Sequence, residues 1–227
     1  MEYKHIFNKD DCWYKNVCHM YDTPDCNRQC IRHIKMHYLA ETSLLTRRQQ
    51  GPINLLCPEQ DSNAVSRLIY IKKNIVRYIQ EGTNLVVMSY NTGNGKTSWM
   101  CKLLMSYFDE IWNSTDFKPR GLFVNTTKFL QGLKGNITEY SQYIQDTVRD
   151  VDVVVWDDVL TDTLTDFEQK QLFYILDDRL NSGKSNFYTT NASNDVLQSI
   201  SPRLHSRIFK ASEVITFTCC DLRGTNL

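Results

Sequence analysis

The stretch Gly93-Asn94-Gly95-Lys96-Thr97 decides the fold that this sequence predicts. It directly follows the apolar run Leu85-Val86-Val87-Met88 and directly precedes a helical pattern that includes Trp99 and Leu103. A glycine-containing loop between a strand and a helix is typical of a phosphate-binding loop, because its backbone N–H groups and the helix N-terminus attract phosphate. A tight strand-to-helix turn that merely contains Gly-Lys-Thr is the alternative.

The side chains of this loop predict binding of ATP with Mg²⁺. In such a loop the lysine, here Lys96, contacts the β- and γ-phosphates, and the hydroxyl of Thr97 holds the magnesium ion. Tyr90 stands where the first glycine of the usual pattern would be, and we expect it to tighten or cover the nucleotide entrance. The residues predicted to bind ATP are Tyr90, Asn91, Thr92, Gly93, Asn94, Gly95, Lys96, Thr97 and Ser98.

A second motif follows further along the chain, where the apolar run Val153-Val154-Val155-Trp156 ends in Asp157-Asp158. In doubly wound sheets, ligands bind at the carboxyl ends of the strands, so we expect Asp157 beside the phosphate-binding loop. There Asp157 would bind Mg²⁺, directly or through water, and Asp158 would polarise the attacking water. An acidic turn after a buried strand is the alternative.

Short apolar strands alternate with helical patterns around these motifs. The predicted strands are Leu85–Met88, Leu122–Val124, Val151–Trp156, Asn186–Thr190 and Val214–Thr218. Helical patterns cover residues 26–38, 61–79, 99–108, 127–149, 167–180 and 202–209. Such alternation predicts an α/β fold with a parallel sheet that helices cover on both faces.

Polar side chains near the predicted nucleotide site indicate further catalytic groups. The fourth strand ends in Thr189-Thr190-Asn191, and a polar side chain there would orient water near the γ-phosphate; an asparagine that ends a strand in a turn is the alternative. Arg203 and Arg207 are one helical turn apart, and an arginine there can stabilise transition-state charge on a neighbouring subunit's nucleotide. A solvated basic helix face is the alternative.

The composition excludes several classes of protein. The chain has 227 residues, of which 41% are hydrophobic, and 26 Lys plus Arg balance 26 Asp plus Glu. This suffices for one core with a small appendage, and the balanced charge argues against a globally basic nucleic-acid coat protein. The sequence has no apolar run that could span a membrane and no apolar stretch of a signal peptide, so we expect a cytoplasmic protein without a membrane partner.

Four of the 8 cysteines lie close together near the N-terminus. They are Cys12, Cys18, Cys26 and Cys30. In a reducing compartment these thiols predict a Zn²⁺ site, which the segment needs because it has too few apolar residues to fold alone. The histidines that could replace a cysteine ligand are His19, His33 and His37, and free thiols are the alternative. We therefore predict a zinc-binding module over residues 1–40, a linker over 41–62 and an ATP-binding domain over 63–227.

The order of these motifs resembles the AAA+ ATPase domain of DnaC/DnaI-type replicative helicase loaders. The resemblance covers residues 63–223 and includes the run Leu-x-Ser-Arg-Ile at residues 204–208. It implies that Asn191 is the sensor-1 residue and that Arg207 is the arginine finger, with Arg203 as the second choice. Many AAA+ proteins have Glu where this chain has Asp158, and a shorter carboxylate implies slow hydrolysis.

The resemblance also implies partners for the chain. Residues 127–149 match an extra helical element of initiator and loader ATPases, where Lys128 and Lys134 would contact single-stranded DNA. Some DnaI relatives carry an N-terminal zinc module that contacts the helicase. AAA+ domains assemble head to tail, so we expect self-association through residues 63–227.

The sequence thus favours an ATP-dependent loader that places the replicative hexameric helicase on single-stranded DNA in the cytoplasm of a bacterial host. The short, diverged chain indicates a phage-encoded form. A transposition-type ATPase of the same AAA+ branch, which engages a transposase, is one alternative. A non-hydrolysing adaptor with a vestigial ATP site is another.

Overall fold

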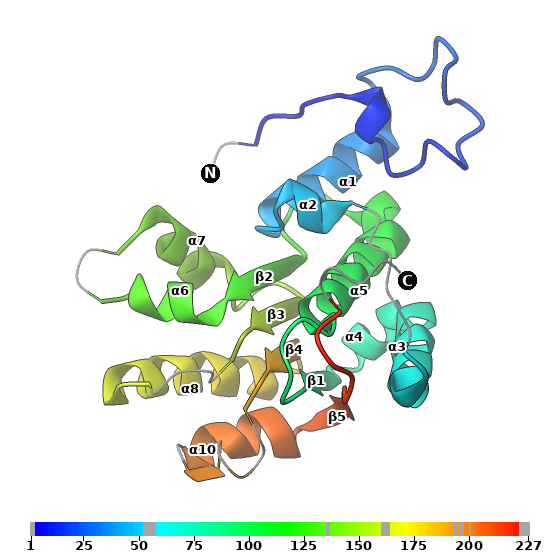
Figure 1. Ribbon diagram of the computed structural model, residues 1–227. Helices are drawn as coiled ribbons and strands as arrows, with labels where there is room; N and C mark the ends of the chain where they lie inside the picture. Colours follow the sequence, from blue (N-terminus) through cyan, green and yellow to red (C-terminus); the bar gives the residue numbers. More distant parts are fainter. Residues whose placement is uncertain are drawn as a thin grey trace.

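A five-stranded parallel sheet forms the centre of the protein, in the strand order β2-β3-β4-β1-β5 (Figure 1). The computed structural model describes residues 3–51, 58–134, 137–159, 164–192, 195, 198–199 and 201–222. The strands are β1 Asn84–Met88, β2 Gly121–Asn125, β3 Val153–Asp157, β4 Ser185–Thr190 and β5 Ser212–Thr216. Every strand pair is parallel, which confirms the predicted α/β fold with a parallel sheet.

Helices cover both faces of the sheet (Figure 1). On β1, Leu85 and Val87 face one core cluster and Val86 and Met88 face the other, so the run is apolar on both faces. The helices of the first face are α1 Ile31–Thr42, α3 Ser62–Lys73, α4 Ile75–Gln80 and α5 Lys96–Ile111. Those of the second face are α6 Thr126–Gln131, α7 Glu139–Thr147, α8 Asp166–Asn181 and α10 Pro202–His205, which continues as a wide π-type turn over Ser206–Lys210. None of the helices in the described ranges is both long and apolar enough to cross a membrane.

The helical stripe predicted over residues 61–79 is two helices, because Asn74 interrupts it. Asn74 has φ −117° and ψ 24°, and its side-chain amide donates to the carbonyl of Tyr70 at 2.9 Å. Such local side-chain bonds compete with the helix ladder, so α3 ends and α4 begins at this residue. The apolar positions on both sides of the break, such as Ile71 and Ile75, are still buried in one core.

The N-terminal segment, residues 3–30, consists of turns that pack against α1 and α5. The helix predicted from about residue 26 starts only at Ile31, because Asn27 accepts from the backbone N–H of Gln29 and forms a local turn. The Tyr14 hydroxyl donates to Asp109 of α5 at 2.6 Å, and the guanidinium of Arg32 lies 3.3 Å from the Tyr14 ring centroid. The predicted domain boundaries stay a prediction, and part of the predicted linker lies outside the described residues.

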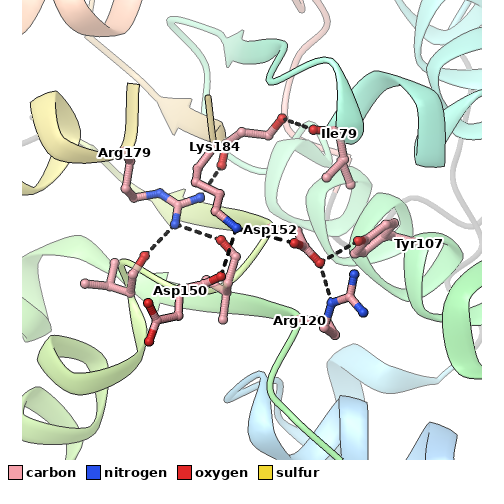
Figure 2. Close-up of polar contacts among 10 residues, drawn as sticks. Ile79, Tyr107, Arg120, Asp150, Asp152, Arg179 and Lys184 are labelled. Atoms are coloured by element: carbon pink, nitrogen blue, oxygen red, sulfur yellow. Dashed lines mark hydrogen bonds and ion pairs between the residues drawn. The ribbon is translucent and has the colours of Figure 1, made fainter. Parts of the chain in front are cut away.

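A polar network around Arg179 lies at the amino end of the sheet (Figure 2). Arg179 is 1% exposed, and it donates to the carbonyls of Val148, Val151 and Ser185 and to Oδ1 of Asn186. Burial lowers the pKa of Arg179 to about 10. The carboxylate of Asp152 at this end accepts from the Tyr107 hydroxyl and from Nε of Arg120, as Figure 2 shows. This end of the sheet is therefore fixed by hydrogen bonds within the chain.

Candidate nucleotide-binding site

The predicted phosphate-binding loop connects β1 to the N-terminus of α5. Gly93 and Gly95 have φ of 74° and 90°, a left-handed conformation that favours glycine and lets the loop turn into the helix. Lys96 is the first residue of α5 and is only 6% exposed. Its Nζ donates to the carbonyl of Asn91 and to Oδ1 of Asn94, both at 3.1 Å. The lysine thus lies over the loop, where a phosphate-binding lysine is needed.

The structure brings together the residues predicted to bind magnesium, Thr97 and Asp157. The Thr97 hydroxyl donates to Oδ1 of Asp157 at 2.9 Å, although β4 separates β1 from β3 in the sheet. Burial raises the pKa of Asp157, while hydrogen bonds from Thr189 and Thr97 oppose this shift. A carboxylate and a hydroxyl at the carboxyl end of parallel strands suit a hard cation that also binds phosphate. Magnesium binding itself stays a prediction.

Asp158 occupies an unusual backbone conformation for a residue with a side chain. Its φ is 55°, and its N–H donates to the Thr189 hydroxyl at 2.9 Å. Left-handed non-glycine residues occur often at functional sites, where the surrounding structure holds them in place. The predicted role of Asp158 in polarising water is consistent with this position directly after β3.

Asn191 follows the carboxyl end of β4, as the sequence predicted for a residue near the γ-phosphate. Its Oδ1 is buried and accepts no hydrogen bond from any residue in the described ranges. A buried polar atom without a partner calls for an explanation, and a bound ligand or water supplies one. Tyr90, by contrast, is 69% exposed at the start of the loop, and its role over the nucleotide entrance stays a prediction.

Neither predicted arginine lies in the nucleotide site of its own chain. Arg207 Nε and Nη2 donate to Oδ1 of Asp177 on α8 at 3.0 and 2.8 Å, and its guanidinium lies 4.7 Å from the Phe173 ring centroid. Arg203 is exposed on α10. A role of Arg207 in a neighbouring subunit therefore stays a prediction.

The two lysines predicted to bind DNA have partners within the chain. Lys128 lies 4.6 Å from the ring centroid of Tyr140, and Lys134 forms an ion pair with Glu168 at 3.0 Å. Glu168 also belongs to the capping box at the start of α8, so this ion pair joins the turn after α6 to α8. DNA binding by these lysines stays a prediction.

The predicted zinc site is not supported. Within the described part of the chain, no group of three or more His, Cys, Asp and Glu side chains is arranged to hold a metal ion. Cys12, Cys18, Cys26 and Cys30 are half-buried free thiols. Burial raises the pKa of Cys12, and the nearby charges of the other three cysteines raise it further. The thiols therefore lie in one region without forming a tetrahedral site.

The histidines proposed as replacement ligands also lie outside any metal-binding arrangement in the described residues. His19 is exposed. His33 Nδ1 lies 2.9 Å from His5 Nε2, and its ring stacks with that of His37. Burial, followed by the charges of the neighbouring histidines, lowers the pKa of His33 to about 4, so it is neutral near pH 7.

Sequence reasoning missed the C-terminal segment that contacts the phosphate-binding loop. The Asn91 side chain donates to the carbonyls of Thr218 and Cys219, and the N–H of Leu222 donates to the carbonyl of Gly93 at 3.1 Å. The buried carboxylate of Asp61 accepts from the N–H and hydroxyl of Thr218. The sequence signal for this contact was Asn91, because its side-chain amide needs a hydrogen-bond acceptor.

A cavity between the N-terminal segment and α5 is separate from this site. It has a volume of about 720 Å³, and Trp13, His37, Lys72 and Lys102 line it. Its described lining includes no residue of the phosphate-binding loop.

The fold and this geometry define the chain as an α/β protein of the P-loop type. No protein-family model matches the sequence, and no curated protein matches it. The fold is similar to that of the DnaC helicase loader, with a TM-score of 0.56 and 22% identity over 71% of this chain and 92% of that chain. It is also similar to that of DnaI, with a TM-score of 0.63 and 17% identity over 79% of this chain and 95% of that chain.

A third similar structure is the replication initiator DnaA bound to AMPPCP and single-stranded DNA. The TM-score is 0.53 and the identity 18%, over 71% of this chain and 47% of that chain. These comparisons confirm the predicted resemblance to the DnaC/DnaI fold, and they extend it to DnaA. A phage origin stays a prediction.

Proposed function

We propose that this protein binds and slowly hydrolyses ATP at the loop between β1 and α5. The observation that carries the proposal is the convergence of Lys96, Thr97 and Asp157 at the carboxyl ends of β1 and β3. Lys96 would exchange its bonds within the loop for the β- and γ-phosphates. A magnesium ion, when bound, would neutralise phosphate charge, with Thr97 and Asp157 as its protein ligands.

Asp158 and Asn191 would act on the attacking water. Asp158 would accept a hydrogen bond from this water, and the Asn191 amide, whose Oδ1 has no partner in the described residues, would orient the water near the γ-phosphate. Aspartate is one methylene shorter than the glutamate of many AAA+ proteins, so hydrolysis would be slow. Slow hydrolysis suits a protein in which ATP acts as a switch.

The biological role that fits best is loading of the replicative hexameric helicase on single-stranded DNA in the bacterial cytoplasm. Two supports are the similar folds of the DnaC helicase loader and DnaI. A third is a similar fold in DnaA that holds both an ATP analogue and single-stranded DNA. A transposition-type ATPase and a non-hydrolysing adaptor would use the same fold, so the test must distinguish them.

The test combines ATP turnover with co-purification of the host's replicative helicase in ATP and in ADP. We expect a defined complex, measurable turnover, and loss of turnover in Lys96→Ala and Asp158→Asn. Lys102→Ala is the matched control, because it removes a lysine from the same helix at a position further from the loop. Turnover without a helicase complex would favour the transposition-type ATPase. A helicase complex without turnover would favour the adaptor.

Arg207 is proposed to complete the ATP site of a neighbouring subunit in a head-to-tail assembly. Its side chain is one-third exposed, so a neighbouring subunit can reach it. In the single chain Asp177 and Phe173 hold this side chain. A mixture of Lys96→Ala and Arg207→Ala subunits tests this. The Arg207→Ala subunit keeps an intact ATP site, and the Lys96→Ala subunit supplies Arg207. Recovery of turnover in the mixture supports the proposal, and absence of recovery contradicts it.

Lys128 and Lys134 are proposed to contact the backbone of single-stranded DNA. Both lie on or next to α6, and each would have to exchange its present contact for phosphate. Removing both lysines should weaken DNA binding and make its dependence on salt shallower. An unchanged salt dependence would exclude them from the DNA path.

A zinc ion is proposed for the four N-terminal cysteines because of their chemistry and their shared region. Binding would have to draw the thiols closer than they lie in the structure. Metal analysis of the purified protein and of Cys26→Ser tests the ligand set. Stoichiometric zinc that is lost in Cys26→Ser supports the proposal, whereas unchanged metal content contradicts it.

A further inference from the structure

One buried hydroxyl joins the two acidic residues that follow the core of β3. The Thr189 hydroxyl donates to Oδ1 of Asp157 at 2.8 Å and accepts from the N–H of Asp158 at 2.9 Å. Thr189 is 0% exposed in the middle strand, β4, which lies between β1 and β3. We propose that Thr189 is a positioning residue for ATP hydrolysis, which holds Asp157 toward the metal and Asp158 toward the attacking water.

The backbone of β3 and β4 shows why Asp158 needs such a residue. Its left-handed φ of 55° is a strained conformation that persists only where neighbouring groups hold it. Besides the bond from Asp158 to the Thr189 hydroxyl, the N–H of Val159 donates to the Thr189 carbonyl at 2.8 Å. The Thr190 hydroxyl donates to the Val159 carbonyl at 2.8 Å. Thr189 thus bonds to Asp158 itself, whereas the Thr190 hydroxyl bonds to the next residue, Val159.

A second hydrogen bond of Thr189 orients the carboxylate of Asp157. The Thr97 hydroxyl also donates to Oδ1 of Asp157, but this hydroxyl is needed for the metal when nucleotide binds. The Thr189 hydroxyl, which donates to the same oxygen at 2.8 Å, then remains to hold the carboxylate in place.

This inference rests on the proposed ATPase activity, so its test includes a measurement that needs no hydrolysis. The variants are Thr189→Val, which removes the hydroxyl at nearly constant volume, and Thr189→Ser, which keeps the hydroxyl. Thr190→Val is the matched control, because it removes a neighbouring hydroxyl that does not contact Asp157. The measurements are hydrogen exchange of the Asp158 amide, ATP affinity without metal, and turnover at saturating ATP.

Thr189→Val should accelerate exchange of the Asp158 amide and reduce turnover, each by about tenfold, while ATP affinity without metal changes less than about threefold. Thr189→Ser should restore both properties, and Thr190→Val should leave exchange of the Asp158 amide close to the wild-type rate.

Unchanged amide exchange in Thr189→Val would overturn the inference, even if the wild-type protein hydrolyses ATP. Equal losses in Thr189→Val and Thr190→Val would also overturn it, because they would indicate a general effect on β4. A wild-type protein without turnover would contradict the proposed function alone. In that case faster amide exchange in Thr189→Val with rescue by Thr189→Ser still supports the positioning role.

Discussion

The two ends of the central sheet both contain buried polar side chains, but these side chains are used differently. At the amino end, Arg179 donates to three backbone carbonyls (Figure 2). It also donates to Oδ1 of Asn186. At the carboxyl end, Asn191 Oδ1 has no partner within the described residues, and Asp158 has a strained backbone. The bonds of Lys96 to the Asn91 carbonyl and to Oδ1 of Asn94 lie within its own loop, where a phosphate can replace them.

The difference teaches how to separate architecture from function in one molecule. Buried polar groups whose bonds are all made within the chain fix the strands relative to one another. Groups that are strained, unpaired or held by replaceable partners are more useful to a ligand than to stability. The following predictions test this division, and they proceed from the largest expected effect to the smallest.

Arg179→Met should destabilise the protein by about 3–5 kcal/mol, because it leaves several buried carbonyls without a donor. The free energy of unfolding from urea denaturation measures this. ATP affinity of the fraction that remains folded should be unchanged. A loss of less than about 1 kcal/mol would show that the amino end does not depend on its network.

Lys96→Ala should have the opposite effects, a large loss of ATP affinity and little change in stability. ATP affinity should fall about a hundredfold, which corresponds to about 2.7 kcal/mol, because the phosphates lose their cation. The free energy of unfolding without nucleotide should stay within about 1 kcal/mol of wild type, since the bonds to Asn91 and Asn94 lie within one loop. Calorimetric titration with ATP and urea denaturation measure the two quantities, and strong destabilisation would contradict the division.

Asp157→Asn should stabilise the protein without ligands at pH 7, by on the order of 1 kcal/mol, as expected when a functional site is relaxed. Burial raises the pKa of Asp157 above 3.8, so its contribution to stability is full below the unfolded pKa and is lost as pH rises through the folded pKa. Removing the carboxyl should therefore flatten the loss of stability above about pH 4. Unfolding measured across this pH range tests the sign, and a less stable variant at pH 7 would contradict it.

Lys184→Gln should cost less than about 1 kcal/mol, although Lys184 belongs to the same end as Arg179. Its Nζ donates to the Asp150 carbonyl at 3.0 Å and lies 3.6 Å from Asp152, but the side chain is partly exposed to water. Urea denaturation of this variant beside Arg179→Met separates the exposed rim of the network from its buried centre. Equal losses in the two variants would show that burial does not decide the effect.

The sequence predicted the parts of the site that depend on strand–loop–helix order. Lys96, Thr97 and Asp157 belong to local sequence motifs at the ends of strands. Parallel strands place their carboxyl ends at the same edge of the sheet, so these motifs meet there regardless of how the side chains pack. Thr189 was missed because its partners, Asp157 and Asp158, lie at the end of β3. The sequence alone does not show that β3 pairs with β4. The polar run Thr189-Thr190 in a buried strand was nevertheless a signal, since buried hydroxyls need partners.

Other features depended on contacts that periodicity cannot show. The break at Asn74 comes from one side-chain amide that bonds to the Tyr70 carbonyl inside an otherwise regular apolar stripe. The cysteine-rich N-terminal segment has a composition typical of zinc-binding modules. The spacing of the cysteines along the sequence, however, does not fix the distances between their thiols. The structure instead shows this segment held on α5 by Tyr14, Arg32 and Asp109.

The strand order has a consequence for folding of the chain during its synthesis on the ribosome. β1 carries the phosphate-binding loop, yet both of its neighbours in the sheet, β4 and β5, come from the last part of the chain. About a hundred residues separate β1 from β4, so at ~5–20 residues per second the apolar strand waits about 5–20 s for its first partner. During synthesis β2 and β3 can pair first, while β1 stays without a strand partner until β4 has been made.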